Sequence, residues 1–335
     1  MATEIESLLE YVVNTGSSEL IITEGAVPAV RMAGRVCAVP DAPVIPFGSL
    51  VEFLGALEGE SGSMIAGPWH DMRWRVRYFR EALGNGAVFR PLLKECPDFQ
   101  SLGVPPVLEN MLSYSSGLVV FAGPSCSGKT TTASAYVGAL CESKILRACF
   151  LDKACELPVK QGNSLILEDS VGGIAEKVDQ ALRSGIDLLW MGDFDSSCLL
   201  PMLRAAEAGA LVVCNVTAGN SAGALDALLA AAKPEDKALA RTMLASALKA
   251  VVVQRLLPGA AEGSGAVPAW EVLLNSQNVA ASVRTGDLFK LPSVIAASAS
   301  DGMLLMDNCL ADLVRSGYVN REDAEKFVAN PARFA

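Results

Sequence analysis

Eight consecutive residues near the middle of the chain have the types and spacing needed to hold a triphosphate. Residues 123–130 are Gly-Pro-Ser-Cys-Ser-Gly-Lys-Thr and fit the phosphate-loop pattern G-x-x-x-x-G-K-[ST]. Such a loop points successive backbone N–H groups inward, and the N-terminus of the following helix adds positive potential. Lys129 would then reach the β- and γ-phosphates, and the Thr130 hydroxyl would ligate Mg²⁺. We therefore predict a site for ATP and Mg²⁺ formed by Gly123, Pro124, Ser125, Cys126, Ser127, Gly128, Lys129, Thr130 and Thr131.

The segments on either side of this loop have the character that it requires. Residues 117–121 are apolar and partly β-branched, which predicts a buried strand, and residues 131–140 have small and apolar groups at helical spacing. A glycine-rich turn that matches by chance is the alternative, and the strand–loop–helix context argues against it.

Hydrolysis of a bound nucleotide also needs carboxylates that hold Mg²⁺ and orient water. Asp193 ends the apolar segment 186–193, as the acid of a Walker B strand does, and Asp152 ends the apolar segment 148–152, with Glu156 one helical turn later. Ligand sites of open α/β sheets lie at the carboxyl ends of strands. We predict catalytic roles for Asp152, Asp193 and Glu156, and metal contacts from Thr130 and Asp193; acids that only cap strands and face solvent are the alternative.

The composition limits the class of protein. The 335 residues are 51% hydrophobic and 19% charged, as in a globular chain, and the formal charge of −10 argues against nucleic acid as a partner. The nine cysteines form no C-x-x-C pair, which indicates neither a zinc site nor a disulfide framework and suits a reducing cytoplasm. Since the chain has neither a basic N-terminal signal nor an apolar run of about 18 residues, we expect a cytoplasmic protein.

The periodicity predicts two domains joined by a linker. In residues 1–93 it predicts helices over 4–13 and 49–58 and strands near 19–23, 28–32, 34–38, 73–80 and 86–90, which make a small α+β domain. Residues 94–110, with their prolines and Gly103, predict the linker. Residues 111–335 alternate strand and helix, with strands near 117–122, 147–151, 187–191 and 210–216, a short β segment at 252–273 and a helical end. This order predicts an α/β fold with a mostly parallel sheet that is covered on both faces.

Further segments match the motifs of one family in order and spacing. They are residues 25–34 (G-x-P-P-x-x-R-x-x-G), 73–76 (R-F-R-V), 86–90 (G-A-V-F-R), 181–193 (A-L-R-x-x-P-D-I-I-L-V-G-E), 206–209 (A-E-T-G), 254–256 and 305–317 (L-D-x-C-L-x-D-L-V-x-x-G). On these residues, and over nearly its whole length, the chain resembles the type IV pilus retraction ATPases (PilT-like) of the type II/IV secretion-ATPase superfamily.

The resemblance implies a PAS-like N-terminal domain followed by a RecA-like P-loop ATPase domain with a helical C-terminal extension. It implies a ring hexamer in the cytoplasm that acts at the inner membrane on the platform protein of the pilus. It also implies that arginines approach the nucleotide at domain or subunit boundaries, where Arg73, Arg75 and Arg90 occupy the matching positions. Arginine suits this role because its planar fork binds phosphate oxygens in pairs; a solvated strand face is the alternative.

Departures from the family pattern fall on the residues that would do the chemistry. Asp152 and Asp193 stand where the family has glutamates, and each is shorter by about 1.3–1.5 Å. A misplacement near 1 Å can cost about 10²-fold in rate. Two histidines of the family are replaced by Ala210 and Thr217, and Cys126 replaces a loop glycine, which strains the loop if that position needs φ > 0.

Two functions therefore remain open on the sequence. The favoured one is an ATP-binding, motor-type subunit of a type IV pilus machine, a P-loop ATPase (ATP + H₂O to ADP + phosphate) that couples slow hydrolysis to retraction and twitching motility. The alternative is a hydrolysis-deficient, nucleotide-binding accessory or regulatory paralogue that assembles with a competent pilus ATPase in a mixed hexamer.

Overall fold

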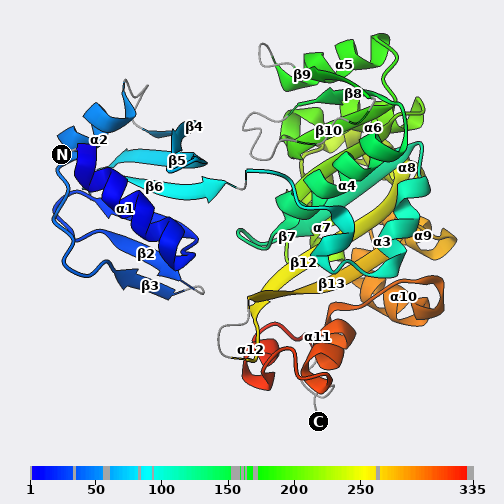
Figure 1. Cartoon of the computed structure of the whole chain (residues 1–335). Helices are drawn as coiled ribbons and strands as arrows, with labels where there is room; N and C mark the ends of the chain where they lie inside the picture. Colours follow the sequence, from blue (N-terminus) through cyan, green and yellow to red (C-terminus); the bar gives the residue numbers. More distant parts are fainter. Residues whose placement is uncertain are drawn as a thin grey trace. The chain divides into compact units, whose positions relative to one another are not determined.

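The computed structural model describes the whole chain except residues 1, 33–34, 56–60, 82–83, 93, 152–158, 160–161, 163, 169–172, 262–264 and 330–335. The described residues form two compact units that part between Glu95 and Cys96. Each unit contains its own β-sheet (Figure 1). Because Asp152 and Glu156 lie outside the described residues, the predictions for these two acids stay predictions.

The first unit is a small α+β domain. Its elements are α1 (Ala2–Thr15), β1 (Glu19–Thr23), β2 (Ala29–Met32), β3 (Arg35–Ala38), α2 (Phe47–Leu54), β4 (Ser61–Trp69), β5 (Met72–Glu81) and β6 (Gly84–Leu92). The strands form an antiparallel sheet in the order β3-β2-β1-β6-β5-β4.

The core of this unit follows from the apolar periodicity. Helix α1 buries Ile5, Leu9 and Val12, which recur at helical spacing. Strand β1 alternates, so that Leu20 and Ile22 are buried with these helical side chains in one cluster. Burial of this face holds α1 against the sheet.

The second unit begins with short helical segments and then alternates strand and helix. Its elements are η1 (Phe99–Leu102), α3 (Pro106–Asn110), η2 (Met111–Ser113), β7 (Gly117–Gly123), α4 (Lys129–Ser143), β8 (Arg147–Phe150), β9 (Leu165–Glu168), α5 (Ile174–Arg183), β10 (Leu188–Asp193), η3 (Ser196–Cys198), α6 (Leu199–Glu207), β11 (Leu211–Thr217), α7 (Ser221–Ala230), η4 (Pro234–Asp236), α8 (Lys237–Ala247), β12 (Leu248–Pro258), β13 (Ala266–Leu274), α9 (Gln277–Thr285), η5 (Leu288–Lys290), α10 (Leu291–Ala297), η6 (Ala299–Asp301), α11 (Met306–Arg315) and α12 (Arg321–Glu325).

The seven strands of this unit lie in the order β13-β12-β7-β11-β10-β8-β9. All neighbours are parallel except β12 and β13, which pair antiparallel at one edge. Every residue of β7 is buried, and since side chains alternate along a strand, both faces of the sheet are covered there. The loop that follows Gly123 therefore begins at the end of a strand in the interior of the sheet.

The predicted fold class is confirmed, with differences in single elements. Strands β4 and β9 were not predicted: β4 carries Gly62, Gly67 and Pro68, which is tolerated because β4 is an edge strand. The short β segment at 252–273 is instead the long antiparallel pair of β12 and β13. Helix α2 starts and ends earlier than the predicted 49–58.

The segment predicted as a linker contains η1 and α3, both within the second unit. Phe99 and Leu108 of this segment are buried, and the Phe99 ring lies 5.6 Å from the ring of Tyr136 on α4. No described helix is long and apolar enough to cross a membrane.

Candidate nucleotide-binding site

The loop between β7 and α4 has a backbone that only small residues can follow. Gly128 caps α4 with φ 80°, in the left-handed region. A Cβ at Gly128 would lie 2.9 Å from the Gln254 side-chain nitrogen, and one at Gly123 would collide with the Ser127 side chain and the Gln254 carbonyl oxygen. The two glycines of the motif are therefore required by close packing as well as by conformation.

Cys126 occupies a left-handed position within the same loop. Its φ is 63°, so the positive φ that would strain a side chain here is present. For a residue with a Cβ this conformation costs about 1–2 kcal/mol. The side chain of Cys126 is exposed, whereas Cys214 on β11 is buried and its pKa is raised by burial to about 12.

Two polar side chains of the loop, those of Lys129 and Ser127, are buried. Lys129 is buried, and its Nζ donates a hydrogen bond of 3.4 Å to the carbonyl oxygen of Pro124, so the amine is folded back over the loop. Ser127 is also buried, and its hydroxyl has no hydrogen-bond partner among the described residues. Buried polar atoms are normally paired. An ammonium and an unpaired hydroxyl beside glycines that leave no room for side chains fit a phosphate group.

Two side-chain amides hold the first turn of α4. Gln254 of β12 accepts a hydrogen bond of 2.7 Å from the Thr132 hydroxyl, and Asn215 of β11 donates one of 3.4 Å to the Thr130 hydroxyl. Since β12 and β11 flank β7, the turn is held from both sides. From the sequence, residues 254–256 were identified only as a family segment, and Asn215 was given no role. The signal that could have identified Asn215 is its single amide side chain in the otherwise almost entirely apolar strand β11.

Asp193 lies at the same edge of the sheet as the loop. It is the last residue of β10, it is exposed, and its register partner on β11 is Asn215. Strand β8 runs parallel to β10, and Leu151, which follows β8, donates its backbone N–H to Trp190. The described chain thus brings Asp193 to the carboxyl ends of the parallel strands; Asp152, the next residue in the sequence after Leu151, lies outside the described residues.

The three arginines implied by the family lie in the first unit. Arg73 and Arg75 are on β5, and Arg90 on β6 is the register partner of Arg75. Arg90 Nη2 forms a 2.8 Å ion pair with one oxygen of Glu19, and Arg31 Nε pairs with the other at 2.8 Å. Burial alone would raise the pKa of Glu19, but these two hydrogen bonds outweigh it and hold the pKa below its usual value. Arg90 therefore has a structural partner within its own domain, which the sequence did not predict.

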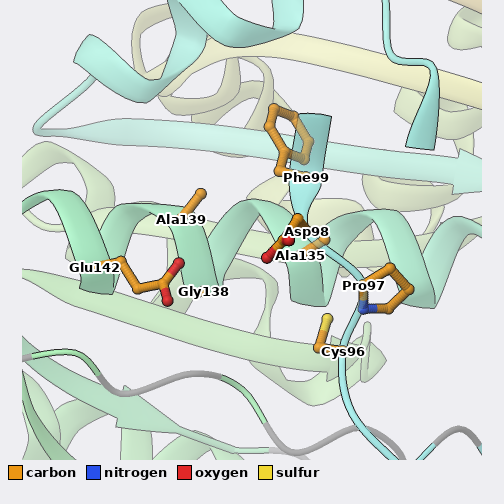
Figure 2. A pocket seen from close by; sticks show the side chains of 8 residues that line it. All are labelled: Cys96, Pro97, Asp98, Phe99, Ala135, Gly138, Ala139 and Glu142. Carbon is orange, nitrogen blue, oxygen red and sulfur yellow. The ribbon is translucent and has the colours of Figure 1, made fainter. Parts of the chain in front are cut away.

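A small hollow elsewhere in the second unit lies apart from this chemistry. It is lined by 96–99 and by residues of α4 from Ala135 to Glu142, and it includes no residue of the phosphate loop (Figure 2). Its volume is about 10 Å³, room for roughly one water molecule. No group of three or more His, Cys, Asp or Glu side chains that could hold a metal ion occurs among the described residues.

The fold and the loop define a two-domain P-loop protein, and comparisons with known proteins place it in a family. The family model described as "Type II/IV secretion system protein" matches residues 68–286, and the chain belongs to this family.

Two curated relatives and one solved structure illustrate the likeness. The type IV pilus retraction ATPase PilT of Pseudomonas aeruginosa is 27% identical over 348 residues, covering 99% of this chain and 100% of PilT. The type IV pilus ATPase PilU of the same organism is 26% identical over 336 residues, covering 96% of this chain and 87% of PilU. A crystal structure of the pilus retraction motor PilT with bound ADP matches with a TM-score of 0.79 and 24% identity over 98% of each chain. This last match shows the shared fold.

Proposed function

We propose that this chain binds Mg²⁺–ATP and is a motor-type subunit of a type IV pilus machine. The observation that carries the proposal is the loop Gly123–Thr131, with its buried Lys129 and its buried Ser127 hydroxyl, which has no hydrogen-bond partner in the part of the chain that the structure describes. The relatives PilT and PilU, named as pilus ATPases, support the type of machine. Bound Mg²⁺ would neutralise charge on the phosphates, as it does in P-loop enzymes generally.

Each residue of the site has a role in this proposal. Backbone N–H groups of Gly123–Thr131 bind the phosphates, Lys129 contacts the terminal phosphates, and Thr130 ligates the metal with Asp193. Asp152 and Glu156 orient water, and Arg73, Arg75 and Arg90 approach the nucleotide from another domain or subunit. One nitrogen of the Arg90 guanidinium already pairs with Glu19, so while that pair holds only the other N–H groups of Arg90 could contact a nucleotide.

The proposed assembly is a ring hexamer, homomeric or mixed with a related ATPase. It would act in the cytoplasm at the inner membrane, on the platform protein of the pilus, and couple hydrolysis to retraction. The proposed domains are 1–93, a linker at 94–110, and 111–335.

The accessory, hydrolysis-deficient alternative is favoured by one set of observations: Asp193 is the shorter acid and is exposed, and Cys126 has a left-handed backbone inside the loop.

Phosphate release by the purified chain, compared with Lys129→Ala, tests the proposal. A working ATPase is expected to release phosphate at least tenfold faster than the variant, because Lys129 supplies charge-assisted hydrogen bonds to the transferring group. Lys326→Ala is the matched control, since Lys326 is exposed and pairs with its near neighbour Asp323. Equal rates in the natural chain and Lys129→Ala would overturn the motor function. ATP binding that persists in that case would leave the accessory function.

A further inference from the structure

Asn215 is a buried amide in a strand that is otherwise almost entirely apolar. Its side chain is 1% exposed. Its Nδ2 donates to Thr130 Oγ1 at 3.4 Å, while its Oδ1 is buried and has no hydrogen-bond partner among the described residues. An unpaired buried acceptor destabilises a folded protein. Its presence beside the phosphate loop points to a partner that the described chain does not supply.

Asn215 lies in the sheet between the strand that leads into the phosphate loop and the strand that ends in Asp193. Strand β11 lies between β7 and β10, and in register Asn215 pairs with Phe121 on one side and with Asp193 on the other. The backbone carbonyl oxygen of Asn215 accepts the backbone N–H of Phe194 at 2.9 Å. The backbone of Asn215 is therefore bonded to the chain that follows Asp193, and its side-chain Nδ2 is bonded to the Thr130 hydroxyl.

The second amide of the loop provides a comparison. Gln254 uses its oxygen on the Thr132 hydroxyl, so its acceptor is satisfied by the protein alone. Asn215 instead uses its N–H group on Thr130, and its side-chain oxygen has no partner within the described part of the chain. A hydroxyl oxygen has two lone pairs. With one lone pair of Thr130 taken by Asn215, the other lone pair is left for a metal ion.

We propose that Asn215 is a positioning residue for the Mg²⁺ complex of a nucleoside triphosphate. Its N–H group fixes the orientation of the Thr130 hydroxyl, and its Oδ1 accepts a hydrogen bond from a water molecule that enters with the bound complex. The proposal rests on the proposed nucleotide site and deepens it. It assigns to Asn215 on β11 a polar contact with the nucleotide complex, in the segment where the family's two histidines are replaced.

The test is the Mg²⁺ dependence of binding in Asn215→Leu. Leucine has a similar size and removes both polar atoms, so the variant is expected to be at least as stable towards urea as the natural chain. The Mg²⁺ concentration that gives half-maximal binding of a fluorescent, non-hydrolysable ATP analogue should rise about tenfold, the loss expected for one such hydrogen bond. Binding of ADP without Mg²⁺ should not change. Asn215→Ala, which creates space instead of filling it, should give the same rise.

Asn275 supplies a matched control. Its Nδ2 donates to the carbonyl oxygens of Ala245 and Leu248, and its Oδ1 is also buried and unpaired within the described chain. Asn275→Leu should change stability and leave the Mg²⁺ midpoint unchanged. An unaltered midpoint in both Asn215 variants, or an equal loss of ADP binding without Mg²⁺, would overturn the inference and leave the nucleotide site standing. Failure of the natural chain to bind the analogue at all would overturn the site as well.

Discussion

The phosphate loop and the acidic edge of the same sheet differ in how their residues are held. Lys129 and Ser127 of the loop are buried, and the first turn of α4 is anchored through Thr130 and Thr132 to the strands on either side. Asp193, by contrast, is exposed at the end of β10.

This difference matters because the two regions would do different work. Phosphate is held mainly by backbone groups whose positions the fold fixes, and this function survives many side-chain changes. Water activation depends on the reach of single carboxylates, and a displacement near 1 Å can cost about 10²-fold in rate. On the proposed function, the molecule therefore keeps the residues that would bind phosphate, while the acids that would activate water are shorter than in the family pattern.

The largest effect is expected from lengthening the two acids. Asp152→Glu combined with Asp193→Glu should raise the rate of phosphate release by about tenfold, because each carboxylate gains roughly the reach that the family's glutamates have. The affinity for ATP should remain unchanged, since the loop is untouched. Steady-state phosphate release and nucleotide titration measure the two quantities.

Asp187→Glu is a suitable control for this pair. Asp187 lies just before β10 and accepts the backbone N–H of Arg147 at the opposite end of the strands. No change in rate in the double variant would contradict the view that shortened acids limit turnover. Turnover would then be limited by Cys126 or by the absence of the two histidines that Ala210 and Thr217 replace.

A second, smaller effect is expected within the loop. Cys126→Gly should stabilise the chain by about 0.5–1 kcal/mol, because release from a left-handed conformation outweighs the larger entropy that glycine has in the unfolded state. Cys126→Ala keeps a Cβ at φ 63° and should bring no such gain. Urea denaturation of the three proteins measures the difference. Equal stability of the glycine and alanine variants would show that the loop carries no strain at this position.

The sequence predicted the fold well because its main signals are local. Apolar periodicity locates α1 and β7, and the glycines of residues 123–128 specify the turn between β7 and α4. Side-chain contacts between residues far apart in the sequence could not be predicted in this way. The pairing of Arg90 with Glu19 joins residues 71 apart, and the Thr132–Gln254 bond joins residues 122 apart. Such contacts depend on strand order, which a single sequence does not specify.

A weaker effect is expected in the first unit, where Glu19 pairs with two arginines. Glu19 is held in its ionised form by Arg31 and Arg90, which lowers its pKa in the folded state from the usual 4.5. A carboxyl group with a lowered folded pKa stabilises the protein above its unfolded pKa, and this contribution is lost as the pH falls through the folded value.

Glu19→Gln should therefore be less stable than the natural chain near pH 7, by less than about 1 kcal/mol because both arginines are partly exposed. The difference should shrink as the pH falls below about 4.5 and through the lowered folded pKa of Glu19. Urea denaturation at several pH values measures it, with Glu10→Gln on the exposed face of α1 as the control. A difference that does not vary with pH would mean that Glu19 acts through packing. The ion pair would then not restrain Arg90, which could turn towards a nucleotide without giving up a stabilising contact.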